Sequence, residues 1–347
     1  MGLRRVKRLS AEAPRVVIFR WDLDKTYLKS EFETLRELVR IPFEKPEDKI
    51  AVPGVVPLIR GLRAVATQAG RDARVYFISA SPTQIAKAIK EKLALDGIEY
   101  DGIVFKNQLQ HLVRGKFRNL REQVGYKLTE LLKSRADMPP ESTEVLFGDD
   151  WESDPVIYSL YADVLANRLA PDELDNVLTT IGVDPQLIVQ AHELAVAAHH
   201  ADVVTRIYIN LERRTPPAHF RLLGARLVPA YNYFQTAVCL YQDQHLTLPA
   251  VAQVAEHLIG TSGYTPQRLA NSLADIVRRG HLTHASAIAV REYLHARGLL
   301  QRRRVAGVRL SAWQRFLRWL RAQPAPQPAD PATINYQTLV AEWRGTR

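Results

Sequence analysis

Short apolar runs alternate with helical patterns along the first two thirds of the chain. Four runs are typical of buried strands in a parallel sheet; they span 16–19, 74–78, 102–105 and 144–147. Between them, apolar residues recur every three or four positions and predict helices at 54–70, 85–93 and 120–131. Regular alternation of strand and helix predicts an α/β fold, with a doubly wound, Rossmann-like parallel sheet.

Later segments continue this sheet and then change character. We expect a helix at 30–39, a helical insertion at about 171–200 and a fifth strand at 203–209, which gives a first domain of residues 1–217. The following pattern predicts an all-α domain over 218–321, with helices at 222–241, 248–259, 266–279, 285–297 and 311–321 and one short candidate strand at 305–310. A proline-rich linker and tail then occupy 322–347.

Polar side chains follow the predicted strands where each strand ends. They are Asp22 and Asp24, Ser79, Lys106 and Asn107, and Asp149 and Asp150. Ligands of open parallel sheets bind at the carboxyl ends of the strands, so this edge is a candidate site. Taken alone, two aspartates after a strand are more typical of a solvated turn.

Composition excludes several classes of protein. The chain has 347 residues, 46% of them apolar and 24% charged, as in ordinary globular proteins. The single cysteine, Cys239, rules out a disulfide framework and a cysteine-built metal site. No stretch approaches the roughly 18 apolar residues of a transmembrane helix, and the basic start is not followed by the apolar segment of a signal peptide. We therefore expect a cytoplasmic location.

The net charge of +10 lies entirely in the last third of the chain. Residues 216–347 hold 16 arginines, no lysine and 6 acidic residues. Such an excess favours an anionic partner, either a phospholipid surface or nucleic acid, although a solvated face in an Arg-rich protein gives the same count. The segment 311–321 places Trp313 and Phe316 on one helical face among arginines, which suits a membrane surface or packing within the domain. Nucleic acid is less favoured: 248–282 only loosely resembles a helix-turn-helix, with a long turn.

Four elements stand in a fixed order along the chain. They are DLDKT beginning at Asp22, a strand ending at Ser79, the isolated Lys127, and GDDWESD containing Asp149. This order resembles the haloacid dehalogenase-like phosphohydrolase superfamily, over about residues 14–217. The resemblance implies a phosphatase that uses Mg²⁺, because a dianionic phosphate ester accepts attack by a carboxylate only when cations neutralise the developing charge.

The resemblance also implies roles for individual residues. Asp22 would be the nucleophile that forms an aspartyl phosphate, and Asp24 would protonate the leaving group and then activate water. Ser79, Thr26 and Lys127 would bind phosphate or steady the loop, with Ser81 as the alternative to Ser79, and Lys116 or Lys133 as alternatives to Lys127. Mg²⁺ would be held by Asp22, the Asp24 carbonyl, Asp149 and either Asp150 or Asp154.

A closer resemblance concerns the actin-patch type phosphatidate phosphatases. FISASP, PGVVPLIRGL, the YK pair before an apolar helix, and GDDWESDPVIY are all similar to segments of their catalytic domain. Two positions depart from that family: Lys25 stands where an acid is usual, and Asp150 where serine is usual. The resemblance implies a lipid substrate such as phosphatidate, while a polynucleotide end, a phosphoprotein or a non-catalytic binding role stay open as alternatives.

The spacing of the motifs leaves no room for a large cap domain. The interval after the first strand holds only about two dozen residues, and the interval after the second is filled by sheet and helix. Superfamily members that act on small molecules usually close the site with such a cap. We therefore expect a substrate presented by something larger: a membrane, a nucleic-acid end or a protein.

Overall fold

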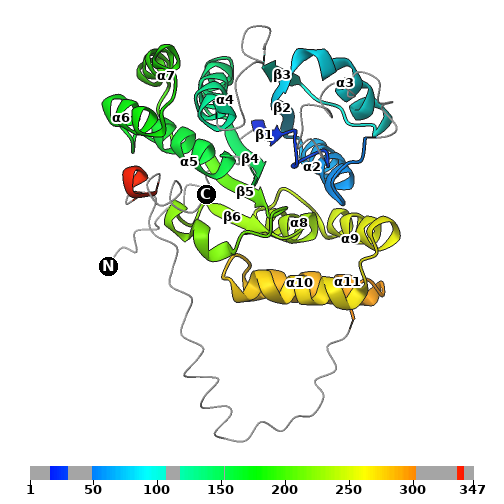
Figure 1. Ribbon diagram of the computed structural model, residues 1–347. Helices are drawn as coiled ribbons and strands as arrows, with labels where there is room; N and C mark the ends of the chain where they lie inside the picture. The colour runs from blue at the N-terminus through cyan, green and yellow to red at the C-terminus, as the bar shows by residue number, and fades with distance from the viewer. Residues whose placement is uncertain (1–15, 30–48, 107–117, 152, 302–333, 340–347) are drawn as a thin grey trace, which may run out of the picture.

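A parallel sheet forms the centre of the protein in a computed structural model that describes residues 16–29, 49–106, 118–151, 153–301 and 334–339 (Figure 1). Its strands are β1 (Val16–Asp22), β2 (Asp72–Pro82), β3 (Gly102–Lys106), β4 (Thr143–Asp149), β5 (Val204–Asn210) and β6 (Leu227–Ala230). Within these residues the sheet has six strands in the order β3-β2-β1-β4-β5-β6, and every pair is parallel. The strands extend the predicted apolar runs by a few residues at their ends.

The chain winds outward from β1 in both directions. It reaches β2 and β3 through α2 (Val55–Gln68) and α3 (Ala86–Leu95), and then returns to β4 and β5 through α4 (Arg118–Ala136) and α5 (Asp154–Leu165). The strand order reverses between β1 and β4, which creates a switch point at their carboxyl ends. The predicted doubly wound α/β fold is thus confirmed.

Alternation along β1 assigns its side chains to two different layers. Val17, Phe19 and Trp21 belong to the buried cluster that contains α2. Successive side chains of a strand point to opposite faces, so Arg20 and Asp22 face the layer of α4 and α5. This places the first aspartate of the DxDxT motif beside α4, which carries Lys127.

The insertion before β5 is helical, as expected, and forms two helices. They are α6 (Pro171–Ile181) and α7 (Pro185–Ala197), separated by Gly182 in the left-handed conformation (φ 85°). Close approach of α7 to α4 requires Gly125, because a Cβ there would lie 2.9 Å from Leu187 Cδ1 of α7. The insertion therefore packs as an outer layer on the α4 side of the sheet (Figure 1).

The sheet continues beyond residue 217, where the sequence placed the end of the first domain. A 3₁₀ helix, η4 (Pro217–Leu223), leads into β6, and α8 begins only at Tyr233. The expected helix over 222–241 is wrong in its first part. Four buried residues, one of them Pro229, give no periodicity, and an edge strand tolerates a proline that cannot donate a hydrogen bond.

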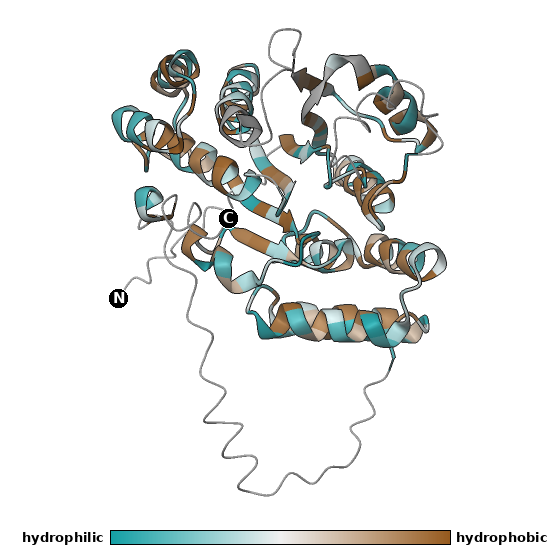
Figure 2. Ribbon diagram, viewed as in Figure 1, coloured by the Kyte–Doolittle hydropathy of each residue, from teal (hydrophilic) through white to brown (hydrophobic). Residues whose placement is uncertain are grey.

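The remaining helices cover the α2 face of the sheet. They are α8 (Tyr233–Gln242), α9 (Leu248–Ser262), α10 (Pro266–Arg278) and α11 (His284–Ala296), close to the predicted ranges. Their apolar sides face inward and share one buried cluster with β1 and α2 (Figure 2). The turn between α9 and α10 spans only 263–265, so the long turn expected from the sequence is also wrong.

Some predicted elements lie outside the described residues. These are the helix at 30–39, the strand at 305–310, the helix at 311–321 and the linker at 322–332. Near the end of the chain, Tyr336 is buried and its hydroxyl donates a hydrogen bond to Asp163 on α5, at 2.5 Å. Among the helices that the structure describes, none combines the length and apolar character needed to cross a membrane.

Candidate active site

Two aspartates meet at the switch point of the sheet. Asp22 ends β1 and Asp149 ends β4, and both are fully buried. Trp21, one residue before Asp22, and Phe147, two residues before Asp149, are register partners whose rings stack with centroids 3.7 Å apart. This aromatic stack fixes the two strand ends relative to each other from the opposite face of the sheet.

Lys127 joins two carboxylates inside this site. Its Nζ lies 2.7 Å from Asp22 Oδ1 and 2.7 Å from Asp154 Oδ1, and all three side chains are excluded from solvent. Charge-assisted hydrogen bonds of this length are strong, and they hold the ammonium in the one place where it balances both acids. Of the alternatives considered, Lys133 pairs with Glu130 at the surface, and Lys116 is outside the described residues.

The site has the donor set of a hard divalent cation. Asp22, Asp149 and Asp154 each bring a carboxylate oxygen within 4.8 Å of the others. With Lys127 among them, these groups carry a formal charge of −2 when ionised, in a place closed to water. A buried, all-oxygen, doubly negative group fits Mg²⁺, so the residues present are compatible with the cofactor implied by the resemblance.

Asp150 follows Asp149 in the sequence, but its carboxylate binds backbone N–H groups of the loop after β5. Its Oδ1 accepts a hydrogen bond from the backbone N–H of Arg213 at 2.8 Å, and its Oδ2 accepts one from that of Thr215 at 2.9 Å. Both oxygens therefore hold the loop after β5. The structure brings Asp154, and not Asp150, into the acidic group with Asp22 and Asp149.

The loop after β1 carries the other candidates. Ser79 Oγ donates a hydrogen bond to Asp24 Oδ2 at 3.1 Å, and Thr26 Oγ1 donates one to Asp149 Oδ2 at 3.4 Å. Asp24 is half-exposed, whereas Asp22 is buried, so Asp24 can reach a group that arrives from solvent. The side chain of Ser81 is outside the described part of the structure, which leaves that alternative as it was.

Two contacts at this loop were missed from the sequence. The hydroxyl of Tyr233, the first residue of α8, donates a hydrogen bond to the Thr26 carbonyl at 2.5 Å. The Nζ of Lys25 lies 3.4 Å from the ring centroid of Trp151, and Lys25 adopts a left-handed backbone (φ 58°). An aromatic residue directly after GDD was the only available signal for the second contact.

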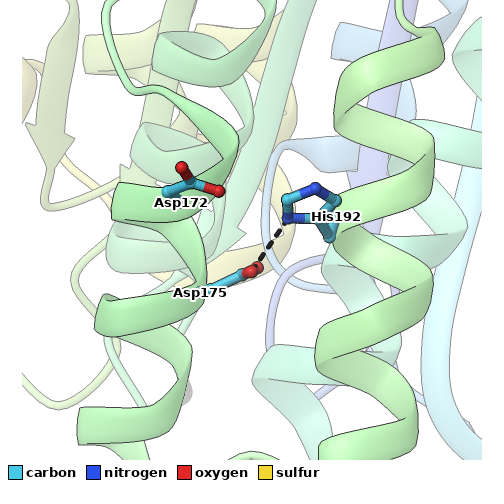
Figure 3. A group of neighbouring side chains, drawn as sticks. All are labelled: Asp172, Asp175 and His192. Carbon is cyan, nitrogen blue, oxygen red and sulfur yellow. Dashed lines mark hydrogen bonds and ion pairs between the residues drawn. The ribbon is translucent and has the colours of Figure 1, made fainter.

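A second group of metal-ligating residue types lies on the helical insertion. Asp172 and Asp175 of α6 face His192 of α7, and His192 Nδ1 lies 2.8 Å from Asp175 Oδ2 (Figure 3). All three are at least partly exposed. The hydrogen bond between the helices accounts for this arrangement, and we assign it no ligand.

The sheet order, the DxDxT loop, the buried lysine and the acidic group resemble those of haloacid dehalogenase-like phosphohydrolases. Comparison with known families agrees: the family described as phosphatidate phosphatase APP1, catalytic domain, matches residues 20–170. Residues 20–170 are thus similar to that catalytic domain, and this similarity indicates a phosphoric monoester hydrolase. Neither the curated proteins nor the solved structures contain a significant match to the chain.

Proposed function

We propose that the protein is a Mg²⁺-dependent phosphatase that forms an aspartyl phosphate on Asp22. The observation that carries the proposal is the contact of Lys127 with both Asp22 and Asp154 beside Asp149. A nucleophilic carboxylate needs positive charge next to it when it approaches an anionic phosphate, and this site supplies one fixed cation and the ligands of a second. Bound Mg²⁺ would add charge neutralisation at the transferring phosphoryl group.

The chain's own residues account for the two half-reactions. An Asp22 oxygen attacks phosphorus while the bond to the leaving oxygen breaks, and Asp24 gives its proton to that oxygen. Asp24, now ionised, takes a proton from water as the water attacks phosphorus, and Asp22 is released with inorganic phosphate. Ser79 orients Asp24 through its hydrogen bond and presents a hydroxyl to the phosphoryl oxygens.

The substrate we propose is a lipid phosphomonoester such as phosphatidate. The family match supports this choice, since that family is described by its phosphatidate phosphatase activity. The excess of arginine in residues 216–347 supports presentation of the substrate by an anionic membrane surface. A polynucleotide end and a phosphoprotein would share the same chemistry and become outcomes of the test.

The experiment is a substrate panel with the full-length protein. Phosphatidate in mixed vesicles, a 5′-phosphorylated oligonucleotide and a phosphopeptide are each assayed with Mg²⁺ and with a chelator. We expect phosphate release from phosphatidate that the chelator abolishes, and a loss of about a thousandfold or more in Asp22→Asn. Asp172→Asn, an exposed acid on α6, serves as control and keeps full activity. Hydrolysis unaffected by Asp22→Asn would contradict the mechanism, and preference for another substrate would correct the lipid assignment.

A further inference from the structure

Two cations share one aromatic ring at the rim of the site. Lys25 Nζ lies 3.4 Å and Arg213 Cζ lies 4.9 Å from the ring centroid of Trp151. The three residues come from the loops after β1, β4 and β5, which meet at the carboxyl edge of the sheet. Lys25 and Trp151 are partly exposed and Arg213 is exposed, so the cations face a region that a ligand can enter.

Each member of this cluster is held by the backbone around it. Lys25 keeps a left-handed conformation, which is unfavourable for a non-glycine residue, and its carbonyl accepts a hydrogen bond from Asn210 Nδ2 at 3.5 Å. The backbone N–H of Trp151 donates to Asp149 Oδ1 at 2.6 Å. Asp150 fixes the backbone of Arg213. The cluster is therefore built on the same strand ends as the acidic group.

The cluster contains two positive side chains, Lys25 and Arg213, and no carboxylate. Among the described residues, neither Lys25 nor Arg213 forms an ion pair with a carboxylate, although the chain has many acidic residues nearby in sequence. A ring face attracts a cation by about 0.5–1 kcal/mol at an exposed site, so Trp151 helps to hold both cations at the rim of the site. An anionic group that binds beside the ring would balance the charge of these cations, and its oxygens would accept charge-assisted hydrogen bonds from them.

We propose that Lys25 and Arg213, assembled on Trp151, form a second phosphate subsite that binds a phosphate group the enzyme does not cleave. The proposal rests on the phosphatase function proposed above and deepens it. Lys25 lies directly between Asp24 and Thr26, so the subsite adjoins the place of the scissile phosphate. The second phosphate is either part of the same molecule or belongs to the headgroup of a neighbouring lipid.

A binding experiment tests the subsite without relying on turnover. Methylenediphosphonate and methylphosphonate, which resist hydrolysis, are titrated calorimetrically into the full-length protein in the presence of Mg²⁺. We expect the two-phosphonate probe to bind about tenfold or more tightly, as charge-assisted contacts to a second anionic group imply. In Lys25→Met/Arg213→Gln this advantage should fall to about twofold or less.

Two further variants separate the subsite from other effects. Trp151→Leu removes the ring but keeps the backbone bond to Asp149, and should lose most of the advantage as well. Arg221→Gln removes an exposed arginine of η4 and should keep it in full. An unchanged advantage in both Lys25→Met/Arg213→Gln and Trp151→Leu, with folded protein by circular dichroism, overturns the proposal. A protein that binds the probe through Lys25 and Arg213 but hydrolyses no phosphomonoester refutes the proposed function and keeps the subsite.

Kinetics then distinguishes the two sources of the phosphate. One arm compares KM for a soluble bisphosphate with KM for the matching monophosphate. The other arm compares the KM for phosphatidate in vesicles of neutral lipid with the KM for phosphatidate in vesicles that also contain phosphatidylglycerol. If the bisphosphate has the lower KM and the double variant loses this difference, the second phosphate belongs to the same molecule. If phosphatidylglycerol lowers the KM and the double variant loses this effect, the second phosphate belongs to a neighbouring headgroup. Equal KM values for the wild type in both arms would contradict the subsite.

Discussion

Gly148 lies directly against Asp154. A Cβ on Gly148 would sit 2.5 Å from Asp154 Oδ2 and 2.6 Å from Asp154 Cβ, so only glycine leaves room for the carboxylate that binds Lys127. Gly148→Ala should displace Asp154, lower kcat by about tenfold to a hundredfold and destabilise the fold by about 1–3 kcal/mol. Steady-state kinetics and denaturant unfolding measure the two effects.

Gly260 provides the matched control for this substitution. It lies in α9, and a Cβ there would meet nothing within 4 Å. Gly260→Ala should keep full activity and stabilise the protein by up to about 1 kcal/mol, because alanine has the higher helix propensity. Equal activity in Gly148→Ala and Gly260→Ala would show that the close packing at Asp154 is irrelevant to catalysis.

Asp150 and Asp154 should respond differently to neutralisation. Asp154→Asn removes a charge from the acidic group, so we expect the Mg²⁺ concentration for half-maximal activity to rise by about tenfold or more. Asp150→Asn keeps the metal requirement and loosens the loop held through Arg213 and Thr215. Activity titrated against Mg²⁺ measures the first effect and limited proteolysis the second. A raised requirement in Asp150→Asn alone would reverse the assignment.

Tyr233 connects the C-terminal helices to the catalytic loop. Tyr233→Phe leaves the buried Thr26 carbonyl without this hydrogen bond, so we expect a loss of about 1–2 kcal/mol in the free energy of unfolding and a several-fold lower kcat. Tyr241→Phe on the same helix is the control, since its hydroxyl makes no hydrogen bond to a described residue. If both variants behave alike, the link to Thr26 has no catalytic role.

Stability should fall when the solution becomes mildly acidic. Burial lowers the pKa of His245 and of His281 from the ordinary 6.5 to about 4. Both imidazoles are neutral in the folded protein, whereas the unfolded chain takes up protons below pH 6.5. The free energy of unfolding is therefore unaffected by these histidines above pH 6.5. It decreases as the pH falls from 6.5 towards 4, by up to about 3 kcal/mol per histidine.

Urea unfolding at a series of pH values between 7 and 4 checks this dependence. His245→Gln removes one of the two buried imidazoles, so the decline in stability over this range should become shallower. His199→Gln is the comparison, because His199 is exposed and its replacement should leave the decline unchanged. A decline in His245→Gln as steep as in the wild type would contradict the role given to burial.

Periodicity revealed much of the fold, and its failures have physical causes. Strands β1 to β5 were visible because buried parallel strands are continuous apolar runs. Helix α5 gave no recognisable pattern, since all of its residues are buried and none of its faces is polar. Strand β6 was read as helix because four residues carry no period, and only pairing with β5 defines them.

The candidate site was predictable where chemistry lies close to a strand end. Asp22 and Asp149 end β1 and β4, whereas Ser79 lies three residues before the end of β2, and the structure brings Lys127 to the same edge of the sheet. Contacts between residues far apart in the sequence could not be predicted from it. The partners of Asp150 lie 63 and 65 residues away, and the hydrogen bond between Tyr233 and Thr26 spans 207 residues. Spacing alone cannot show which of two nearby acids turns inward.

The anchoring of the loop after β5 by Asp150 has an evolutionary consequence. Asp150 and Lys25 are the two motif positions that depart from the phosphatases that the chain resembles. Asp150 fixes the backbone of Arg213, and Lys25 lies over the Trp151 ring that Arg213 also approaches. Among homologues, these residues should be gained or lost as a set, and such a set would mark one branch of the family by what it accepts as substrate.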